Sequence, residues 1–354
     1  MERKFLKGNE AMAEAAVRAG CRFFSGYPIT PQSEIPEYLS WRLKEVGGVF
    51  VQAESEVAAI NMVFGAACSG KPCMTSSSST GISLKSEGLS YMAQSRLPAV
   101  VLNVMRCGPG LGGIFPAQSD YLQATKAQGH GGFKMIVLAP STVQEAVDLI
   151  YDAFELAFRD RNPVMVLPDG VIGLMMESVN LPDYRTLDIP DWAVRGSGWQ
   201  NKHHEIIPMC WSGEDLERDN IAMGEMFKRW AENDVRYEEY CMKDCETVIV
   251  AYGTVARMCK TVVDQCREEG IKIGLIRPIT LNPFPYKALE ALDPQKVRKV
   301  LAVEMCIPSQ IKDDVRLGVH DRIPVETFGR SGGVVITPEE IYAHIRKMEE
   351  AEKK

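Results

Sequence analysis

Short, continuously apolar segments alternate with segments of helical periodicity along most of this chain, and this alternation restricts its fold more than any other feature. PAVVLNVMR, MIVLAP and PVMVLPDG are such apolar segments, and the stretch from Val143 to about Phe158 carries apolar residues at helical spacing. Strands that are apolar throughout are buried on both faces, as in a parallel sheet covered by helices. The sequence therefore predicts an α/β fold built on a doubly wound, mostly parallel sheet.

The alternation breaks between about Leu181 and Asp244 and resumes at TVIVAYG. The interrupting segment contains EDLERDNIAMGEMFKRWAENDVRYEEY, whose pattern predicts one long amphipathic helix. We therefore predict an α/β domain over residues 1–185, a linker or arm with a long helix over residues 186–245, and a smaller α/β domain over residues 246–354.

Composition indicates which kinds of partner and which cellular location to expect. Lys plus Arg is 40 and Asp plus Glu is 47, which gives a net charge of −7 without a basic run, so we expect no nucleic-acid partner. The longest apolar stretches are strand-sized, well short of the ~20 residues that a membrane-spanning helix needs. No apolar signal-peptide core follows the N-terminus. We expect a cytoplasmic protein without a membrane span.

The cysteines bear on redox chemistry. There are ten of them, and in a large cytosolic chain we expect thiols, most of them small core residues. No C-x-x-C occurs, since Cys241 and Cys245 are four apart and Cys68 and Cys73 are five apart. Ferredoxin-type clusters need such clustered thiolates. Any iron–sulfur cluster must therefore belong to another chain.

In a parallel sheet the functional site lies beyond the carboxyl ends of the strands. At one such end, GYPITP places Thr30 between two prolines that stiffen the backbone, as a site residue or as part of a structural turn. At another, Arg106 follows an apolar strand, where a cation is costly without an anionic partner. That partner is either a structural carboxylate or a substrate carboxylate gripped bidentately.

A third strand end, QAESEVAA, carries Glu54 and Glu56. Residues two apart on a helix do not share a face, so both glutamates cannot point the same way if both are helical. The helix dipole is a sufficient structural reason for either carboxylate. The functional alternative is a glutamate buried among Ala, Met and Val, which can hold a proton near neutral pH because desolvation disfavours the charged form.

Other polar segments give weaker signals. The glycine-rich loop from Cys107 to Gly113 lacks the spacing of a dinucleotide fingerprint. The serines from Ser76 to Ser79 either line a pocket or connect a strand to a helix. His130, in GHGG, has a side chain that titrates near neutral pH, but a lone loop histidine is more often a hydrogen-bonded spectator. No metal-ligand spacing occurs.

Taken together, GYPITPQSEIPEYL, QAESEVAAINMVFGAACSG and LPAVVLNVMRCGPG resemble the α-subunit of the 2-oxoacid:ferredoxin oxidoreductases. These thiamine-diphosphate enzymes convert a 2-oxoacid, coenzyme A and oxidised ferredoxin to acyl-CoA, carbon dioxide and reduced ferredoxin. The resemblance covers nearly the whole chain. Within the family, the chain is most similar to the branched-chain (2-oxoisovalerate) type, with the 2-oxoglutarate type as the near alternative.

The resemblance implies roles for particular residues. The first domain would be of the pyrimidine-binding type and the second of the transketolase C-terminal type. Glu56 would contact N1′ of the aminopyrimidine, with Glu54 as the reserve assignment, and Thr30 would lie near the thiazolium and the substrate. Arg106 would hold the 2-oxoacid carboxylate. Where the family often has His-Gly-Asp, this chain has His-Gly-Gly from His130, so no role of that aspartate carries over.

The resemblance also implies partners. The sequence lacks the Gly-Asp-Gly segment that binds Mg²⁺ and the pyrophosphate in such enzymes. A β-subunit would supply that site and an iron–sulfur cluster, ferredoxin-like γ- or δ-subunits would take the electrons on to ferredoxin, and this chain alone would be inactive. Two other hypotheses are half of a non-oxidative 2-oxoacid decarboxylase and a non-catalytic scaffold. The scaffold hypothesis predicts that Glu56, Thr30 and Arg106 lie far apart or point into the core.

Overall fold

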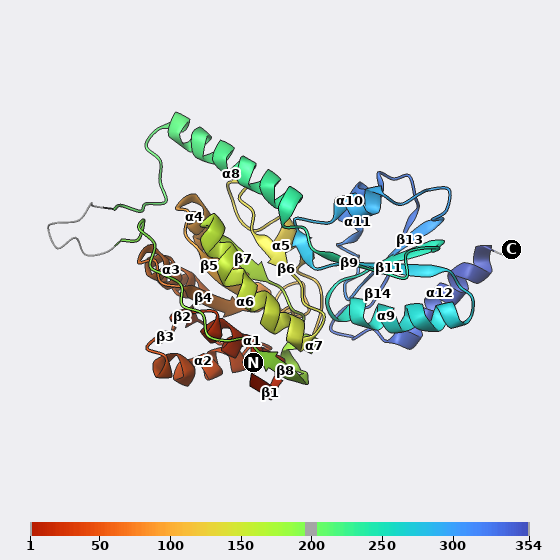
Figure 1. The fold of residues 1–354 in the computed structure, drawn as a ribbon, viewed down its shortest axis with the longest axis horizontal. Coiled ribbons are helices and arrows are strands. Elements are labelled where there is room, and N and C mark those ends of the chain that lie inside the picture. Colours follow the sequence, from red (N-terminus) through yellow and green to blue (C-terminus); the bar gives the residue numbers. More distant parts are fainter. Residues whose placement is uncertain (1, 195–203, 353–354) are drawn as a thin grey trace.

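The computed structural model describes residues 2–194 and 204–352. Its larger sheet has the strand order β12-β6-β7-β5-β4-β2-β3, and strands β2 to β7 run parallel. These strands are β2 (Phe23–Gly26), β3 (Val49–Gln52), β4 (Cys73–Ser77), β5 (Ala99–Asn103), β6 (Ile136–Leu138), β7 (Pro163–Val166) and the antiparallel β12 (Thr280–Asn282). The doubly wound parallel sheet predicted from the apolar segments is thus present (Figure 1).

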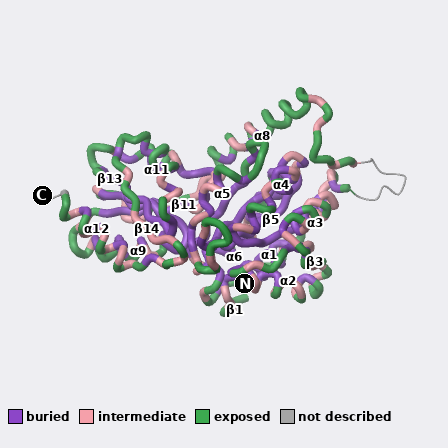
Figure 2. The backbone as a smooth tube through the Cα atoms, turned by 180° about the vertical axis from the view of Figure 1, so that it is seen from behind, coloured by how far each residue is buried: buried purple, intermediate pink, exposed green. Residues whose placement is uncertain are grey.

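Helices cover both faces of this sheet because successive strand residues point to opposite sides. Val101 packs with helices α3 and α4 on one face, and Val100 packs with α1, α2 and α6 on the other. Figure 2 shows the strands buried between these helices. The helices are α1 (Gly8–Arg18), α2 (Glu34–Glu45), α3 (Glu56–Cys68), α4 (Thr80–Gln94), α5 (Tyr121–Thr125), α6 (Val143–Asp160) and α7 (Gly170–Leu174).

The second half of the chain builds a smaller sheet with the order β14-β13-β10-β11-β9. Its strands are β9 (Tyr237–Tyr240), β10 (Thr247–Val250), β11 (Ile273–Pro278), β13 (Lys299–Glu304) and β14 (Val325–Gly329). Its helices are α9 (Gly253–Glu268), α10 (Tyr286–Glu290), α11 (Lys312–Val319) and α12 (Pro338–Glu352). The apolar side of this sheet that carries Val248 joins the core formed by α3 and α4, so the two halves share one core.

Several pairings lie outside the sequence predictions. Strand β1 (Glu2–Lys7) pairs antiparallel with β8 (Met176–Leu181), and β12 crosses back to pair with β6. Strand β9 lies in the segment expected to be an arm, yet it joins the second sheet beside β11. The division at residues 185 and 245 remains a prediction, and two strands cross it: β12 of the second part joins the first sheet, and β9 of the predicted arm joins the second.

The predicted amphipathic helix forms as α8 (Gly213–Asn233), at the upper edge in Figure 1. Its buried residues are Met223, Met226 and Trp230, all in its second half. The Trp230 indole nitrogen donates to Asp160 Oδ2 at 2.8 Å, which ties α8 to the end of α6. No helix among the described residues combines the length and apolarity needed to cross a bilayer. The cysteines all lie in the described ranges and are free thiols, most of them buried, as predicted.

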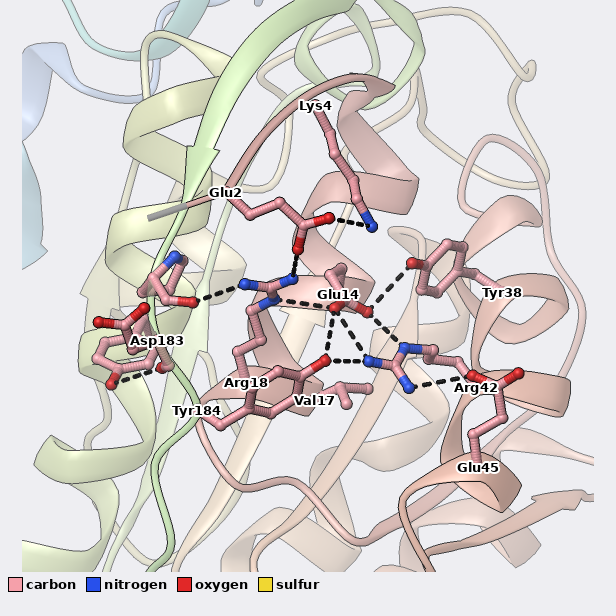
Figure 3. A network of polar contacts seen from close by, with 12 residues as sticks. Glu2, Lys4, Glu14, Val17, Arg18, Tyr38, Arg42, Glu45, Asp183 and Tyr184 are labelled. Carbon is pink, nitrogen blue, oxygen red and sulfur yellow. Dashed lines mark hydrogen bonds and ion pairs between the residues drawn. The ribbon is translucent and has the colours of Figure 1, made fainter.

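A buried polar network locks the N-terminal elements together (Figure 3). Glu14 on α1 is 1% exposed and accepts hydrogen bonds from Arg18 Nε at 2.9 Å, Arg42 Nε at 2.9 Å and the Tyr38 hydroxyl at 3.1 Å. Arg18 also donates to the carbonyl of Pro182 at 3.0 Å. The network therefore joins α1, α2 and the segment that follows β8.

We expect Glu14→Gln to lower the free energy of unfolding by about 2 kcal/mol at neutral pH, because it removes the buried carboxylate that Arg18 and Arg42 share and weakens their charge-assisted hydrogen bonds. Burial raises the pKa of Glu14, but hydrogen bonds from Arg42 and Arg18 outweigh it, and the net pKa lies below the ordinary value. Folding therefore gains from the ionised form above the unfolded pKa of about 4.3 and loses that gain as the pH falls through the lower folded pKa.

Urea denaturation at pH 7 and at successively lower pH values tests this prediction. Glu45→Gln is the matched control, since Glu45 also contacts Arg42 but its side chain is 58% exposed, and its loss should change stability by less than about 1 kcal/mol. A Glu14→Gln deficit that equals the Glu45→Gln deficit, or that does not shrink in acid, would contradict the account.

Candidate active site

The connection from β4 to α4 is held in an unusual backbone conformation. Ser79, the N-cap residue of α4, has φ 40° and ψ −88°, a left-handed φ that is strained for a residue with a side chain. Its hydroxyl donates to Asp120 Oδ2 at 2.6 Å, and its backbone N–H donates to Asn103 Oδ1 at 2.9 Å. Asn103 in turn donates to the same Asp120 oxygen at 3.0 Å. This buried triad fixes where α4 begins.

Arg106 lies directly beside this start of α4. It is 6% exposed, its backbone N–H donates to Ser79 Oγ at 3.0 Å, and its guanidinium donates to the carbonyl of Thr30 at 3.0 Å. Further bonds run to the carbonyl of Leu111 at 3.1 Å and the hydroxyl of Thr80 at 3.2 Å. All these acceptors are neutral. Within the described residues no carboxylate lies within ion-pair distance of this guanidinium, and its Nε is buried without a hydrogen-bond partner.

This geometry bears on whether the anionic partner of Arg106 is a structural carboxylate or a substrate carboxylate. In residues 2–194 and 204–352 no carboxylate forms a direct ion pair with Arg106, although the charge of the buried Asp120 acts on it. The unbonded Nε leaves the guanidinium able to bind an external anion. Thr30 is exposed and lies against Arg106 through its carbonyl. The proline-framed loop and the strand-end arginine are thus brought together, as the strand-end argument predicts.

The two glutamates after β3 differ in their surroundings. Glu54 is exposed and precedes the helix, whereas Glu56 is 5% exposed and is the first residue of α3. Ser55 caps this helix by accepting a hydrogen bond from the backbone N–H of Ala58 at 3.1 Å. The cap turns Glu56 inward. Only the residue chosen first from the sequence therefore lies in a buried environment.

The Glu56 carboxylate rests in a notch that glycine makes in α4. A Cβ atom on Gly81 would lie 2.4 Å from Glu56 Oε1 and 2.1 Å from Ser77 Oγ, so no larger residue fits while these side chains keep their places. In the described parts of the chain this carboxylate accepts no hydrogen bond, and the buried hydroxyls of Ser77 and Ser78 lack partners. Buried polar groups are normally paired. These atoms mark a place for a polar ligand.

The first turn of α4 joins the two halves of the site. Thr80 bonds to Arg106, which contacts Thr30, and the neighbouring Gly81 packs on Glu56. The N-terminal end of a helix also favours negative charge. Of the two arrangements that the scaffold hypothesis predicts, wide separation does not hold for Thr30 and Arg106, which are in contact. Glu56 and Arg106 are both buried, so convergence of the three residues on one cleft stays a prediction.

Lys85 is a site neighbour that the sequence argument missed. It is fully buried on α4, one turn after Gly81, and its amine donates to the Thr75 hydroxyl and to the carbonyl of Ser76 at 3.4 Å. Burial lowers the pKa of Lys85 to about 7, while the charge of Glu56 opposes that shift. No feature of the sequence marked it, because a single lysine in a polar segment normally indicates exposure to solvent.

His130 and the glycine-rich loop lie outside the cluster or serve it indirectly. The Ser90 hydroxyl is 3.3 Å from the His130 ring nitrogen, ten residues or about 15 Å along α4 from Thr80. In the loop, Gly112 has φ 60°, and a Cβ there would lie 1.9 Å from the carbonyl oxygen of Cys107. The tight turn that this glycine permits presents the Leu111 carbonyl to Arg106.

A cavity of about 660 Å³ opens beside the first turn of α4. Thr80, Ser83 and Gly110 line it from the first half of the chain, and Cys306, Ser309 and Lys312 line it from the second. The space beside the candidate site is therefore bounded by both halves.

Comparison with known proteins places this arrangement in a class. Residues 14–229 match the family model described as "Pyruvate flavodoxin/ferredoxin oxidoreductase, thiamine diP-bdg", and residues 245–341 match "Pyruvate:ferredoxin oxidoreductase core domain II". The chain thus belongs to a class of thiamine-diphosphate-binding oxidoreductases. More particularly, the chain belongs to the 2-oxoacid:ferredoxin oxidoreductase family.

Individual relatives agree with this family. The ketoisovalerate oxidoreductase subunit VorB of Methanothermobacter marburgensis is 45% identical, over 98% of both chains. The 2-oxoglutarate synthase subunit KorA of Methanothermobacter thermautotrophicus is 33% identical, over 98% of this chain and 99% of that relative. The solved 2-oxoglutarate:ferredoxin oxidoreductase of Magnetococcus marinus superposes with a TM-score of 0.86 at 25% identity, covering 98% of this chain and 65% of that one. The predicted fold class is confirmed.

The residues present fit one end of thiamine diphosphate. Its aminopyrimidine is a flat ring with polar edges, which suits a buried carboxylate and hydroxyls that lack partners, as at Glu56, Ser77 and Ser78. The pyrophosphate end needs a bound cation. Among the described residues no group of three or more His, Cys, Asp or Glu side chains is placed to hold a metal ion.

Proposed function

We propose that this chain is the α-type subunit of a 2-oxoacid:ferredoxin oxidoreductase and supplies the residues that meet the aminopyrimidine and the substrate carboxylate. One observation carries the proposal: a buried carboxylate, Glu56, and a buried guanidinium that bonds only to neutral acceptors and leaves its Nε without a partner, Arg106, flank the same first turn of α4. Buried charged groups whose hydrogen-bonding atoms lack partners cost stability in the free chain. An aminopyrimidine bound to Glu56 and a substrate carboxylate bound to Arg106 explain why these two side chains lie there.

Each residue then has a task. Thiamine diphosphate supplies, when bound, the carbon nucleophile and electron sink that decarboxylation of a 2-oxoacid requires. Glu56 holds and releases a proton at the ring nitrogen N1′, which its burial favours by keeping water away. Arg106 holds the substrate carboxylate until carbon dioxide leaves, and Thr30, beside it, borders the same space.

The rest of the machinery belongs to partner chains in this proposal. The sequence has neither Gly-Asp-Gly nor C-x-x-C, so a β-subunit carries the Mg²⁺ and pyrophosphate site and an iron–sulfur cluster. Ferredoxin-like γ- or δ-subunits pass electrons to ferredoxin, coenzyme A accepts the acyl group, and the isolated chain is inactive. Ten free thiols suit a cytoplasmic location for the complex.

A branched-chain 2-oxoacid such as 2-oxoisovalerate is the favoured substrate. The relative named for ketoisovalerate is 45% identical, against 33% for the one named for 2-oxoglutarate. The loop that contacts Arg106 also exposes Leu111, Ile114 and Phe115, which suit an aliphatic substituent. A second substrate carboxylate, as in 2-oxoglutarate, would need a further cation. 2-Oxoglutarate remains the alternative, given the superposition on an enzyme named for it.

The test is to purify the complex with its native partners and assay a panel of 2-oxoacids with coenzyme A and ferredoxin. We expect kcat/KM for 2-oxoisovalerate to exceed that for 2-oxoglutarate at least tenfold, which corresponds to about 1.4 kcal/mol. The opposite ranking would favour the 2-oxoglutarate assignment. Release of aldehyde without any need for coenzyme A or ferredoxin would favour the non-oxidative decarboxylase instead.

A further inference from the structure

Lys85 is fully buried and has no role in the reaction as described so far. Lysine is almost never fully buried unless it is paired with an opposite charge. Its amine instead contacts the neutral Thr75 hydroxyl and the carbonyl oxygen of Ser76. In the part of the chain that the structure describes, no carboxylate lies within ion-pair distance of it. A cation kept at this cost calls for an explanation beyond packing.

The position of Lys85 directs its charge toward Glu56. Gly81 and Lys85 are four residues apart on α4 and so share one face of that helix. Helical side chains lean toward the N-terminus, so the Lys85 side chain covers the turn that contains Gly81. That glycine forms the notch for the Glu56 carboxylate. The amine also contacts Ser76, whose neighbour Ser77 shares the same notch.

Among the groups around the Lys85 amine, Glu56 is the charged one. The contacts from β4 are a hydroxyl and a carbonyl, both neutral, and Glu56, from α3, is the charge that acts on Lys85. Burial lowers the pKa of Lys85 to about 7, and the carboxylate opposes that shift. The amine therefore changes its charge in the same pH range in which an enzyme of neutral pH works.

We propose that Lys85 is a positioning residue whose charge sets how firmly Glu56 holds the proton that it shares with N1′ of the bound coenzyme. The inference rests on the proposed function. When Lys85 is charged it stabilises the Glu56 carboxylate, so the shared proton is released more easily. When the amine loses its own proton, that stabilisation ends and the shared proton is held more firmly.

The test uses the assembled complex with thiamine diphosphate and Mg²⁺. The near-ultraviolet circular dichroism difference between complex with and without coenzyme is followed against pH, because it reports the protonation of the aminopyrimidine without turnover. Lys85→Met removes the charge with a similar volume, and we expect its titration midpoint to move upward by about one pH unit. Lys85→Arg keeps a permanent cation where the lysine is charged only part of the time, so its midpoint should lie below that of the wild type.

Lys299→Met is the matched control, since Lys299 is 6% exposed but lies on β13 of the second sheet. It should leave the midpoint unchanged even if it lowers stability. A Lys85→Met midpoint equal to that of the wild type, or a Lys85→Arg midpoint equal to or above it, would overturn the inference. If Lys85→Met fails to assemble, the Lys85→Arg result still decides.

Failure of the inference is distinguishable from failure of the proposed function. If Glu56→Gln abolishes the pH-dependent signal while both Lys85 variants titrate as the wild type does, only the role of Lys85 is wrong. If the wild-type complex shows no coenzyme-dependent signal, or Glu56→Gln leaves that signal unchanged, the assignment of Glu56 itself is wrong.

Discussion

Glu56→Gln should lower the rate of acyl-CoA formation by the assembled complex at least about a hundredfold, and it should leave assembly intact. The amide has nearly the same size and still fits the notch at Gly81, but it cannot exchange a proton with the coenzyme ring. Proton transfer by a positioned side chain typically contributes 10²- to 10⁴-fold, so the loss of this one group should dominate the kinetics. Steady-state assays with ferredoxin reduction as the readout measure the effect.

The chain offers a matched control two residues away. Glu54→Gln removes the same charge from the same strand-to-helix connection, but Glu54 is exposed and lies outside the helix. Its turnover should stay within about twofold of the wild type, as is usual for surface substitutions that touch no special feature. Near-normal turnover of Glu56→Gln, or an equal loss in Glu54→Gln, would refute the assignment of Glu56.

Arg106→Met should raise KM for the 2-oxoacid and lower kcat/KM about a hundredfold. The Arg106 guanidinium is a buried cation at the site, and losing a charge-assisted bond to a carboxylate removes about 1.5–3 kcal/mol of binding. Arg106→Lys keeps the charge without the planar fork, so its kcat/KM should fall between those of the wild type and Arg106→Met.

The affinity for thiamine diphosphate separates this role from a structural one. Arg106 also holds the carbonyls of Thr30 and Leu111, so its loss could instead loosen the whole site. If Arg106 binds the substrate carboxylate, coenzyme affinity measured by titration stays within about twofold in both variants. A parallel loss of coenzyme affinity, or an unchanged KM for the 2-oxoacid, would contradict the role.

The parts of the candidate site that depend on local sequence could be predicted. Apolar strands followed by helices dictate that strand ends gather at one edge of the sheet, so Thr30 and Arg106 were expected to be neighbours. The choice between Glu54 and Glu56 needed the cap at Ser55, which decides where the helix begins. That no carboxylate of the described residues forms a direct ion pair with Arg106 could be seen only in the whole structure, because a carboxylate from any distant segment could have reached it.

The features that could not be predicted from the sequence depend on pairing between distant strands and on the orientation of helices. Strand β1 finds its partner in β8, far along the chain, and β12 returns from the second half to the edge of the first sheet. No local pattern specifies such partners. The burial of Lys85 likewise depends on which face α4 turns to β4, and a single lysine in a polar-looking segment normally indicates solvent. The segment from Tyr237 to Tyr240 reads as helix but pairs with β11 as strand β9, since tertiary pairing overrides local propensity.

The central claim is that Glu56 meets the aminopyrimidine of a coenzyme whose phosphates another chain anchors. A cryo-electron microscopy map of the assembled complex with thiamine diphosphate and Mg²⁺ tests it most directly. We predict a Glu56 carboxylate oxygen within about 2.6–3.2 Å of N1′, with the pyrophosphate and its metal on the partner subunit. A ring bound away from Glu56, or a pyrophosphate and metal held by this chain alone, would contradict the account.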